Sequence, residues 1–277
     1  LADAQMAAKD KNAAAASLRK ALEIKPDLLE AQRGLIMIDV DAKRFEQALK
    51  VARDVQKQNP KSVAGFALEG DISAAQKNWD AAAGAYRAGL KLGPASELAT
   101  KLYSVLRVSG KGPDADKFAA TWQKDNPKDA VFVFYLGDEA IARKDYGAAE
   151  KNYAAVVKLQ PNNAVAYNNL AWVTGKLGKD GAIAHAEKAN TLAPNQPAFI
   201  DTLAMLLSGK GDHAKATELQ TKAVALQPNN QLFRLNLAKI HIGGGKKDLA
   251  RKELDELAKL GDKFPQQAEV AEMLKGL

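Results

Sequence analysis

Proline recurs along this chain at nearly constant intervals, and this spacing constrains the fold more than any other feature of the sequence. Seven of the ten prolines are 33 or 34 residues apart: Pro26, Pro60, Pro94, Pro127, Pro161, Pro194 and Pro228. Twelve residues before each of them stands an alanine, and the series is Ala14, Ala48, Ala82, Ala115, Ala149, Ala182 and Ala216, which Ala250 continues. A period of this length predicts a stack of repeated structural units.

The two recurring residues indicate that each unit is a pair of antiparallel helices. Proline cannot continue a helix and disfavours helical angles in the residue before it, so it separates one pair from the next. The small alanine fits the closest approach of two helices, where a larger side chain would overpack the contact. Polar or glycine-containing turns, such as residues 143–146, 176–180 and 208–212, separate the two helices of a unit.

The clearest unit covers residues 130–163. Its first helix is predicted to carry an apolar stripe of Val133, Leu136, Gly137 and Ala140, and its second helix carries Ala149, Tyr153 and Val156 at helical spacing. Gly137 is expected to let the neighbouring helix come close. Residues 131–136 alone have the propensity of a β-strand, but their place in the period predicts a helix.

This pattern resembles the tetratricopeptide repeat family over nearly the whole chain. Tyr86 and Tyr153 match the aromatic of the motif's second helix, whereas Ala52, Ala119, Ala186 and Gln220 depart from it, and Glu69 replaces a leucine. The resemblance implies an all-α fold, a right-handed superhelical α-solenoid of about eight hairpins with a C-terminal capping helix. The chain would be a single array at 1–277, with a truncated repeat at 1–28, hairpins at 29–62, 63–95, 96–129, 130–163, 164–196, 197–230 and 231–264, and the capping helix at 265–277.

The repeat register also gives an expectation for the two ends. Leu1 and Ala2 would fall in the middle of a first helix, which predicts that the sequence is a fragment of a longer protein. Residues 266–275 are expected to cap the stack, with one face on the last hairpin and the other in water.

Residues that could carry out chemistry are sparse. The chain has no cysteine, which excludes disulfides and thiolate metal sites, and the unequal repeat positions of His185, His213 and His241 do not favour a shared metal site. No G-x-S-x-G elbow is present, and residues 243–247 (GGGKK) lack the strand and spacing of a phosphate loop. We therefore predict no enzyme activity and no cofactor.

Charge narrows the partners only a little. The net charge of +7 favours acidic partners, but the lysines are scattered in singles and pairs, which does not favour nucleic acid. The main prediction is a partner protein, bound through a peptide or helix segment.

The resemblance also implies where that partner binds. In tetratricopeptide superhelices the first helix of each hairpin lines a concave groove that holds the ligand. By position, the central groove residues are Arg107, Phe134, Asp138, Ile141, Asn168, Trp172, Lys176 and Met205, and further positions include Arg33, Met37, Asp71, Asp201 and Lys239. Phe134 and Trp172 are predicted anchors, with packing against neighbouring helices as the alternative. Phe134 and Asp138 stand where a carboxylate clamp would need lysine and asparagine, so Asn168 is expected to serve helix packing.

A narrower resemblance concerns residues 167–172 (YNNLAW) and 257–265 (LAKLGDKFP), which look like the tetratricopeptide lipoproteins of PEP-CTERM/exosortase exopolysaccharide systems. It implies a periplasmic or outer-membrane location through a missing lipid anchor, although a cytoplasmic location stays open. Three functions then remain: an interaction scaffold in exopolysaccharide export or surface-protein sorting, a direct polysaccharide binder, and an accessory region of an enzyme.

Overall fold

The computed structural model describes residue 2 and residues 10–277, and these residues form helices joined by short turns. Within them, sixteen α-helices and one 3-10 turn, η1, follow one another. They are α2 (Lys11–Ile24), α3 (Leu29–Asp41), α4 (Phe45–Gln58), α5 (Ala64–Ala75), α6 (Trp79–Leu90), α7 (Ser96–Val108), α8 (Gly112–Asp125), α9 (Ala130–Ala142), α10 (Tyr146–Leu159), α11 (Ala164–Lys176), α12 (Ala182–Leu192), α13 (Pro197–Gly209), α14 (His213–Leu226), α15 (Gln231–Gly243), α16 (Lys247–Ala258), η1 (Gly261–Lys263) and α17 (Gln267–Lys275). The predicted all-α solenoid of helical pairs is confirmed.

Consecutive helices pack against each other, and each pair from α3/α4 to α15/α16 falls inside one of the hairpins that the sequence period delimits. Helix α17 packs against α16, where the capping helix was expected. Ala2 is helical, but the rest of the first helix of the predicted truncated repeat, including Leu1, lies outside the described residues.

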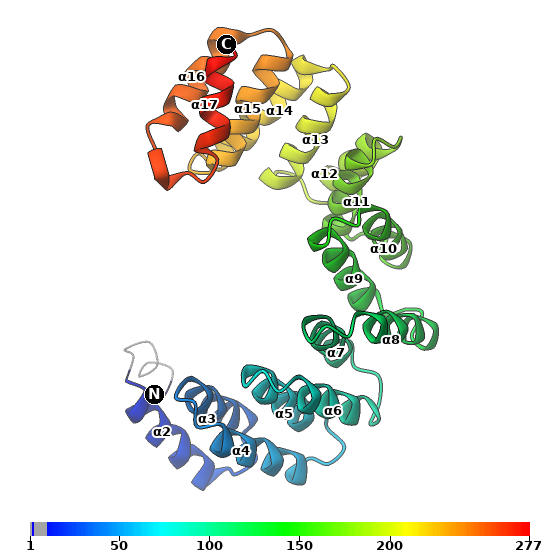
Figure 1. Ribbon diagram of the computed structural model, residues 1–277, viewed down its shortest axis with the longest axis vertical. Helices are drawn as coiled ribbons and strands as arrows, with labels where there is room; N and C mark the ends of the chain where they lie inside the picture. The colour runs from blue at the N-terminus through cyan, green and yellow to red at the C-terminus, as the bar shows by residue number, and fades with distance from the viewer. Residues whose placement is uncertain (1, 3–9) are drawn as a thin grey trace. The chain divides into compact units, whose positions relative to one another are not determined.

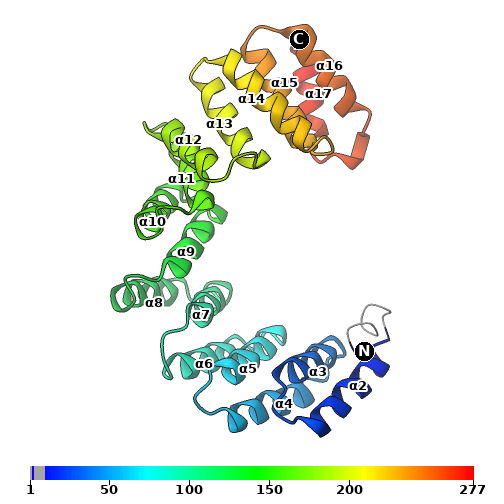
Figure 2. The same cartoon turned by 180° about the vertical axis from the view of Figure 1, so that it is seen from behind.

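The chain divides into two compact units, Leu1–Phe132 and Val133–Leu277. In the first unit, helix α3 lies beside α5, and the second helices α4 and α6 form an outer layer (Figure 1). In the second unit, α13 contacts both α11 and α15, while α12 and α14 lie on the other side, as the view from behind also shows (Figure 2). The first helices of successive hairpins therefore share one face within each unit.

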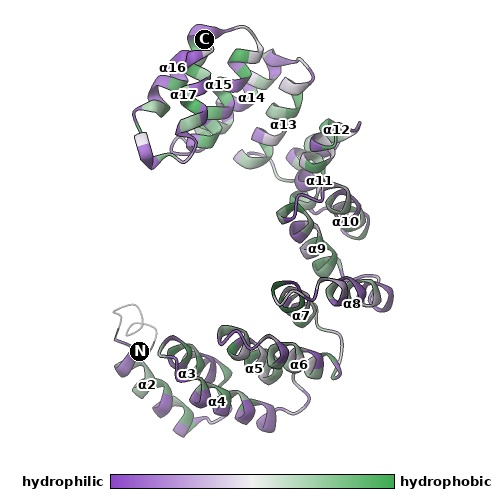
Figure 3. Cartoon of the chain, viewed as in Figure 1, coloured by the Kyte–Doolittle hydropathy of each residue, from purple (hydrophilic) through white to green (hydrophobic). Residues whose placement is uncertain are grey.

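The periodic alanines lie in the helix contacts, as predicted. Ala14, Ala48, Ala82, Ala115, Ala149, Ala216 and Ala250 are fully buried, and Ala182 is 6% exposed. Gly137 also has its predicted role, because a Cβ atom there would lie 2.7 Å from Cε1 of Tyr153 on α10. Hydrophobic and hydrophilic stretches alternate along the helices, as expected when one side of each helix is buried (Figure 3).

Short polar residues start several of the second helices. The side chains of Asn78, Asp145 and Asp212 each accept a hydrogen bond from the backbone N–H three residues later, at 3.3, 3.0 and 3.1 Å. Such N-caps satisfy a helix N–H group that has no partner inside the helix. The turns before these helices contain left-handed residues, among them Lys77 with φ 60° and Gly211 with φ 88°. Sequence and backbone thus agree on where each hairpin turns.

Three sequence interpretations can be checked directly. Residues 131–136 lie within α9, so the helical register outweighs their strand propensity. The glycines at 243–245 end α15 and form the turn before α16, as expected. Glu69 is held by polar contacts, since Gln56 Nε2 donates to its Oε2 over 2.7 Å and Arg53 lies 3.8 Å from its Oε1. A polar contact between α4 and α5 therefore takes the place of the leucine that the motif would supply.

Candidate functional site

A groove of about 800 Å³ lies in the second unit, along the shared face of α11, α13 and α15. The turn before α12 closes one end of it. Its lining includes Trp172, Lys176, Asp201, Met205, Asn236 and Lys239. Among the predicted groove residues, Trp172, Lys176 and Met205 are thus brought together, and Asp201 and Lys239 join them.

Trp172 forms the aromatic wall of this groove. The indole is partly buried, and the ring of Tyr146 meets it edge to face at 5.6 Å between centroids. The ammonium of Lys176, one helical turn later, lies 5.2 Å from the centroid of the Trp172 ring, which is cation–π geometry. These two contacts hold the ring in place before any ligand arrives.

Asp201 is the acidic residue of the groove, and amide groups from two other helices hold it. Gln220 Nε2 on α14 donates to Asp201 Oδ1 over 2.6 Å, and Asn236 Nδ2 on α15 donates to the same oxygen over 2.8 Å. Gln220 is fully buried and also donates to the backbone oxygen of Phe233 over 2.9 Å. Burial raises the pKa of Asp201 above its ordinary value, and the two amide bonds oppose that rise.

Phe134, the other predicted anchor, has a different neighbour. It is partly buried and meets the ring of Tyr153 edge to face at 5.5 Å. Phe134 and Ile141 pack against a buried cluster built around Tyr153 and Ala149. Phe134 is not among the residues that line the 800 Å³ groove. The two predicted anchors therefore do not form one aromatic pair, although Trp172 packs on the same buried cluster.

Asp138 and Asn168 are placed by polar contacts. Asp138 is exposed, and its Oδ1 accepts a hydrogen bond from the Tyr153 hydroxyl at 2.5 Å. Burial, followed by the bond to Asp138, raises the pKa of Tyr153 far above its ordinary value. Asn168 Nδ2 lies 3.5 Å from Oδ1 of Asn169, within the partly buried face of α11.

Arg107 belongs to the first unit, on α7. Its guanidinium lies 6.0 Å from the centroid of the Tyr103 ring, and its Nη1 lies 3.3 Å from Oδ1 of Asp116 on α8. These contacts tie the first helix of that hairpin to the second.

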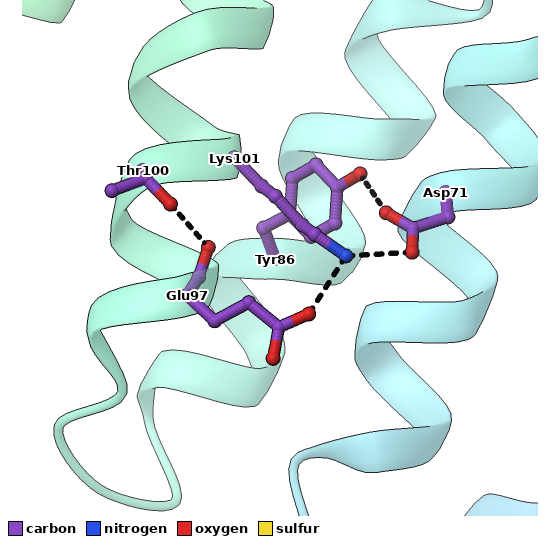
Figure 4. A network of polar contacts seen from close by, with 5 residues as sticks. All are labelled: Asp71, Tyr86, Glu97, Thr100 and Lys101. Carbon is purple, nitrogen blue, oxygen red and sulfur yellow. Dashed lines mark hydrogen bonds and ion pairs between the residues drawn. The ribbon is translucent and has the colours of Figure 1, made fainter. Parts of the chain in front are cut away.

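The first unit has a smaller groove of about 450 Å³ in the equivalent place, along α3, α5 and the start of α7. Arg33, Met37 and Asp71, all predicted from the period, line it together with Glu97. A polar network stands beside it (Figure 4), in which the Tyr86 hydroxyl donates to Asp71 at 2.7 Å. The ammonium of Lys101 lies 2.7 Å from Asp71 and 2.9 Å from Glu97, so two carboxylates share one cation.

The same environment shifts two pKa values. Burial, together with the bond to Asp71, raises the pKa of Tyr86 far above its ordinary value. Burial alone would lower the pKa of Lys101, but the bonds to Asp71 and Glu97 outweigh it and raise that pKa. The phenol and the ammonium are therefore both held in their protonated forms.

One arrangement of polar side chains recurs in every second hairpin. A carboxylate on a first helix accepts a bond from the second helix of its hairpin, at the matching positions Tyr86, Tyr153 and Gln220, which are 67 residues apart. The next hairpin supplies Lys101 in the first case and Asn236 in the third. Sequence reasoning missed these contacts and took Gln220 only as a departure from the motif. The signal was the spacing of 67 residues.

Two classes of site receive no support from the geometry. Over residues 10–277, no group of three or more histidine, aspartate or glutamate side chains is placed to hold a metal ion. Across the same residues, no helix combines the length and the apolar character that crossing a bilayer requires.

The comparisons with known proteins agree with the hairpin architecture. A family model described as tetratricopeptide repeat matches residues 5–72 and 207–274. Among curated proteins, the small glutamine-rich tetratricopeptide repeat-containing protein 2 of Mycosarcoma maydis is 32% identical over 103 residues, which are 37% of this chain and 29% of that protein. The cellulose synthase operon protein C of Pseudomonas fluorescens is 32% identical over 103 residues, which are 36% of this chain and 8% of that protein. The chain thus spans less than a third of the length of either relative.

Solved structures with the same kind of fold include two helical-repeat proteins. The Cut9–Hcn1 hetero-tetramer of the APC/C gives a TM-score of 0.56 at 15% identity, covering 99% of this chain and 54% of that chain. The PilF protein of Pseudomonas aeruginosa gives a TM-score of 0.56 at 18% identity, covering 75% of this chain and 95% of that chain. At these identities the similarity concerns the fold alone.

Proposed function

The chain is a tetratricopeptide repeat protein, a non-catalytic scaffold for protein–protein interaction, and we propose that it holds a segment of a partner protein in the groove formed by α11, α13 and α15. The observation that carries this proposal is the composition of that groove. Trp172 and Met205 offer apolar contact area on a preformed surface, and charged and amide groups surround them. A partly buried aromatic beside polar groups is the usual form of a binding hot spot.

The arrangement of the helices supports the same proposal. Asn236 on α15 and Gln220 on α14 both donate to Asp201 on α13, so contacts below the groove fix the spacing of its walls. A wall that is already ordered loses little conformational entropy when a ligand binds. Met205 then presents a flexible thioether that adapts to different apolar side chains.

We place the scaffold in bacterial exopolysaccharide export or surface-protein sorting, in the periplasm or at the outer membrane. Two observations support this assignment. Residues 167–172 and 257–265 resemble the lipoproteins of PEP-CTERM/exosortase systems, and the chain is similar to part of the cellulose synthase operon protein C of Pseudomonas fluorescens. The partner would then be another component of the export or sorting machinery.

Site-specific photocrosslinking tests the groove in the living source organism. A photoreactive phenylalanine derivative replaces Met205 in the groove or, as the control, Lys222 on the outer helix α14, where the side chain is exposed. We expect protein adducts from position 205 that position 222 does not give. Identical adducts from both positions, or adducts from position 222 alone, would refute binding in the groove. Mass spectrometry of the adducts would identify the partner.

Direct polysaccharide binding is the alternative, and one observation favours it. Trp172, Asp201 and Asn236 line the same groove, and an aromatic ring beside carboxylate and amide groups can bind a sugar ring and its hydroxyls. A soluble β-glucan oligosaccharide should then quench or shift Trp172 fluorescence in the wild type and have no effect in Trp172→Phe/Asp201→Asn. No response from the wild type would exclude β-glucan as the ligand.

A further inference from the structure

We propose that the groove of the second unit selects an acidic segment with apolar side chains, and that Lys176 and Lys210 are its charge-selecting residues. This inference rests on the proposed function and adds the chemistry of the partner. It follows from the charges that line the groove, from how each charge is already paired, and from the contrast with the first unit.

Lysine dominates the rim of the groove. Lys176, Lys179, Lys210 and Lys239 line it, whereas Asp180 and Asp201 are its only acidic lining residues among those that the structure describes. Asp180 is fully exposed on the turn. Asp201 accepts hydrogen bonds from Gln220 and Asn236, so these amides already satisfy part of its carboxylate. The lining thus carries an excess of positive charge.

Two of these four lysines already have close partners outside the groove. Lys239 Nζ lies 2.8 Å from Glu269 on α17, and Lys179 is paired with Glu150 on α10. The other two do not. Lys210 Nζ lies 4.0 Å from Asp180, at the outer limit of an ion pair, and within residues 10–277 Lys176 forms a cation–π contact but no ion pair. Lys176 and Lys210 are therefore the cations that a ligand can recruit at the smallest cost.

Their positions suit contact with one ligand. Lys176 is the last residue of α11 and Lys210 follows the last residue of α13, so both stand at the hairpin-turn end of two adjacent first helices. The floor beside them is apolar, since Ile183, Met205 and Leu206 line the groove and pack on the buried cluster of this hairpin. An acidic segment would place its carboxylates on the two ammonium groups and its apolar side chains on this floor.

The equivalent groove of the first unit has the opposite lining. Asp41, Asp71 and Glu97 line it, with Arg33 as its basic residue among those described. The two grooves share helix positions and differ in charge, so the positive lining of the second groove is a property of that groove rather than of the repeat. This contrast is why we assign acidic specificity to the second unit only.

Binding of designed peptides to the whole chain tests the proposal. Three fluorescent peptides of about twelve residues share the same leucines at helical spacing and carry Glu, Lys or Ser at all other positions. Fluorescence anisotropy should show that the Glu peptide binds about tenfold or more tightly than the Ser peptide, with an affinity that falls as salt rises. Polygalacturonate, an acidic polymer without apolar side chains, should compete weakly when matched for charge.

Charge reversal locates the site. Lys176→Glu/Lys210→Glu should weaken the Glu peptide about tenfold or more and strengthen the Lys peptide, a gain that mere unfolding cannot produce. Lys188→Glu/Lys222→Glu is the matched control, because it reverses two exposed lysines on the outer helices α12 and α14 of the same unit. Both variants are first checked for wild-type circular dichroism.

Four results would overturn the inference: no binding of the Glu peptide, no preference for it over the Ser peptide, an equal loss in the control variant, or stronger competition by polygalacturonate. The proposed function fails separately. If Met205 crosslinks a partner segment that is neutral or basic, the scaffold assignment stands and the acidic specificity is wrong. If position 205 gives no protein adduct, the groove assignment itself is wrong.

Discussion

The same substitution at two glycines of one hairpin should have opposite effects on stability. Gly70 on α5 is buried, and a Cβ atom there would lie 2.2 Å from Cε1 and 2.5 Å from Cδ1 of Tyr86. Gly84 on α6 is exposed, and among the described residues nothing lies within 4 Å of the position of its Cβ. Both residues are inside helices, so replacing either with alanine gains about 1 kcal/mol of helix propensity.

The difference between the two variants isolates the packing cost. The ring of Tyr86 cannot move aside easily, because it is 2% exposed and its hydroxyl is bonded to Asp71 at 2.7 Å. Overpacking of such a contact costs about 1–3 kcal/mol. We therefore expect Gly84→Ala to raise the free energy of unfolding by up to about 1 kcal/mol. Gly70→Ala should lie about 1–3 kcal/mol below Gly84→Ala.

Urea denaturation followed by far-ultraviolet circular dichroism measures both variants. A second background makes the test specific: in Tyr86→Ala the clashing ring is gone, so adding Gly70→Ala should stabilise by about 1 kcal/mol, as Gly84→Ala does. If Gly70→Ala stabilised the wild-type chain as much as Gly84→Ala does, the close approach of α5 and Tyr86 would be refuted.

Three further predictions concern packing, pH and charge. Ala149→Phe should lower the free energy of unfolding by about 1–3 kcal/mol, because Ala149 is fully buried between α9 and α10; an unchanged melting temperature would contradict the hairpin register. The pKa values of Tyr86 and Tyr153 are raised in the folded state, so their contribution to stability is fully present below about pH 10, where tyrosine in the unfolded chain begins to ionise, and is lost as the pH rises above that value. Urea titrations on both sides of about pH 10 should show a slope of up to about 1.4 kcal/mol per pH unit for each tyrosine, and Tyr86→Phe should remove one share of it. Lys101→Met should cost about 1 kcal/mol, since Lys101 bridges Asp71 and Glu97, whereas Lys57→Met should cost less than about 0.5 kcal/mol because that ion pair is exposed; equal costs would show that the bridge adds nothing.

Much of the fold could be predicted from one-dimensional information. The proline period separates the hairpins, and the alanine period marks the buried contacts, because both depend on local backbone preference and residue size. The same register shows that residues 131–136 are helical against their propensity. Position in the period also places Trp172, Lys176 and Met205 in one groove, since those positions face the same side of successive first helices.

The details of the groove could not be predicted in this way. The period indicates which side of a helix Phe134 faces, but not that the ring turns to Tyr153 rather than toward Trp172. Side-chain rotamers follow from the packing of several helices at once. The pairing of Lys179 with Glu150 and of Lys239 with Glu269 depends on such contacts, and so does the identity of the two lysines left for a ligand.

The polar contacts that repeat every 67 residues connect the fold to the site. Tyr86, Tyr153 and Gln220 occupy the same position in alternate hairpins, and each donates to a carboxylate on a first helix. In the first unit a lysine completes the contact, so the carboxylate is neutralised within the protein. In the second unit Asn236 completes it without adding charge. Because the same backbone arrangement supports both versions, a single substitution at this position can change the charge of a groove without changing its shape, which is how a repeat protein can diversify its ligands while keeping its fold.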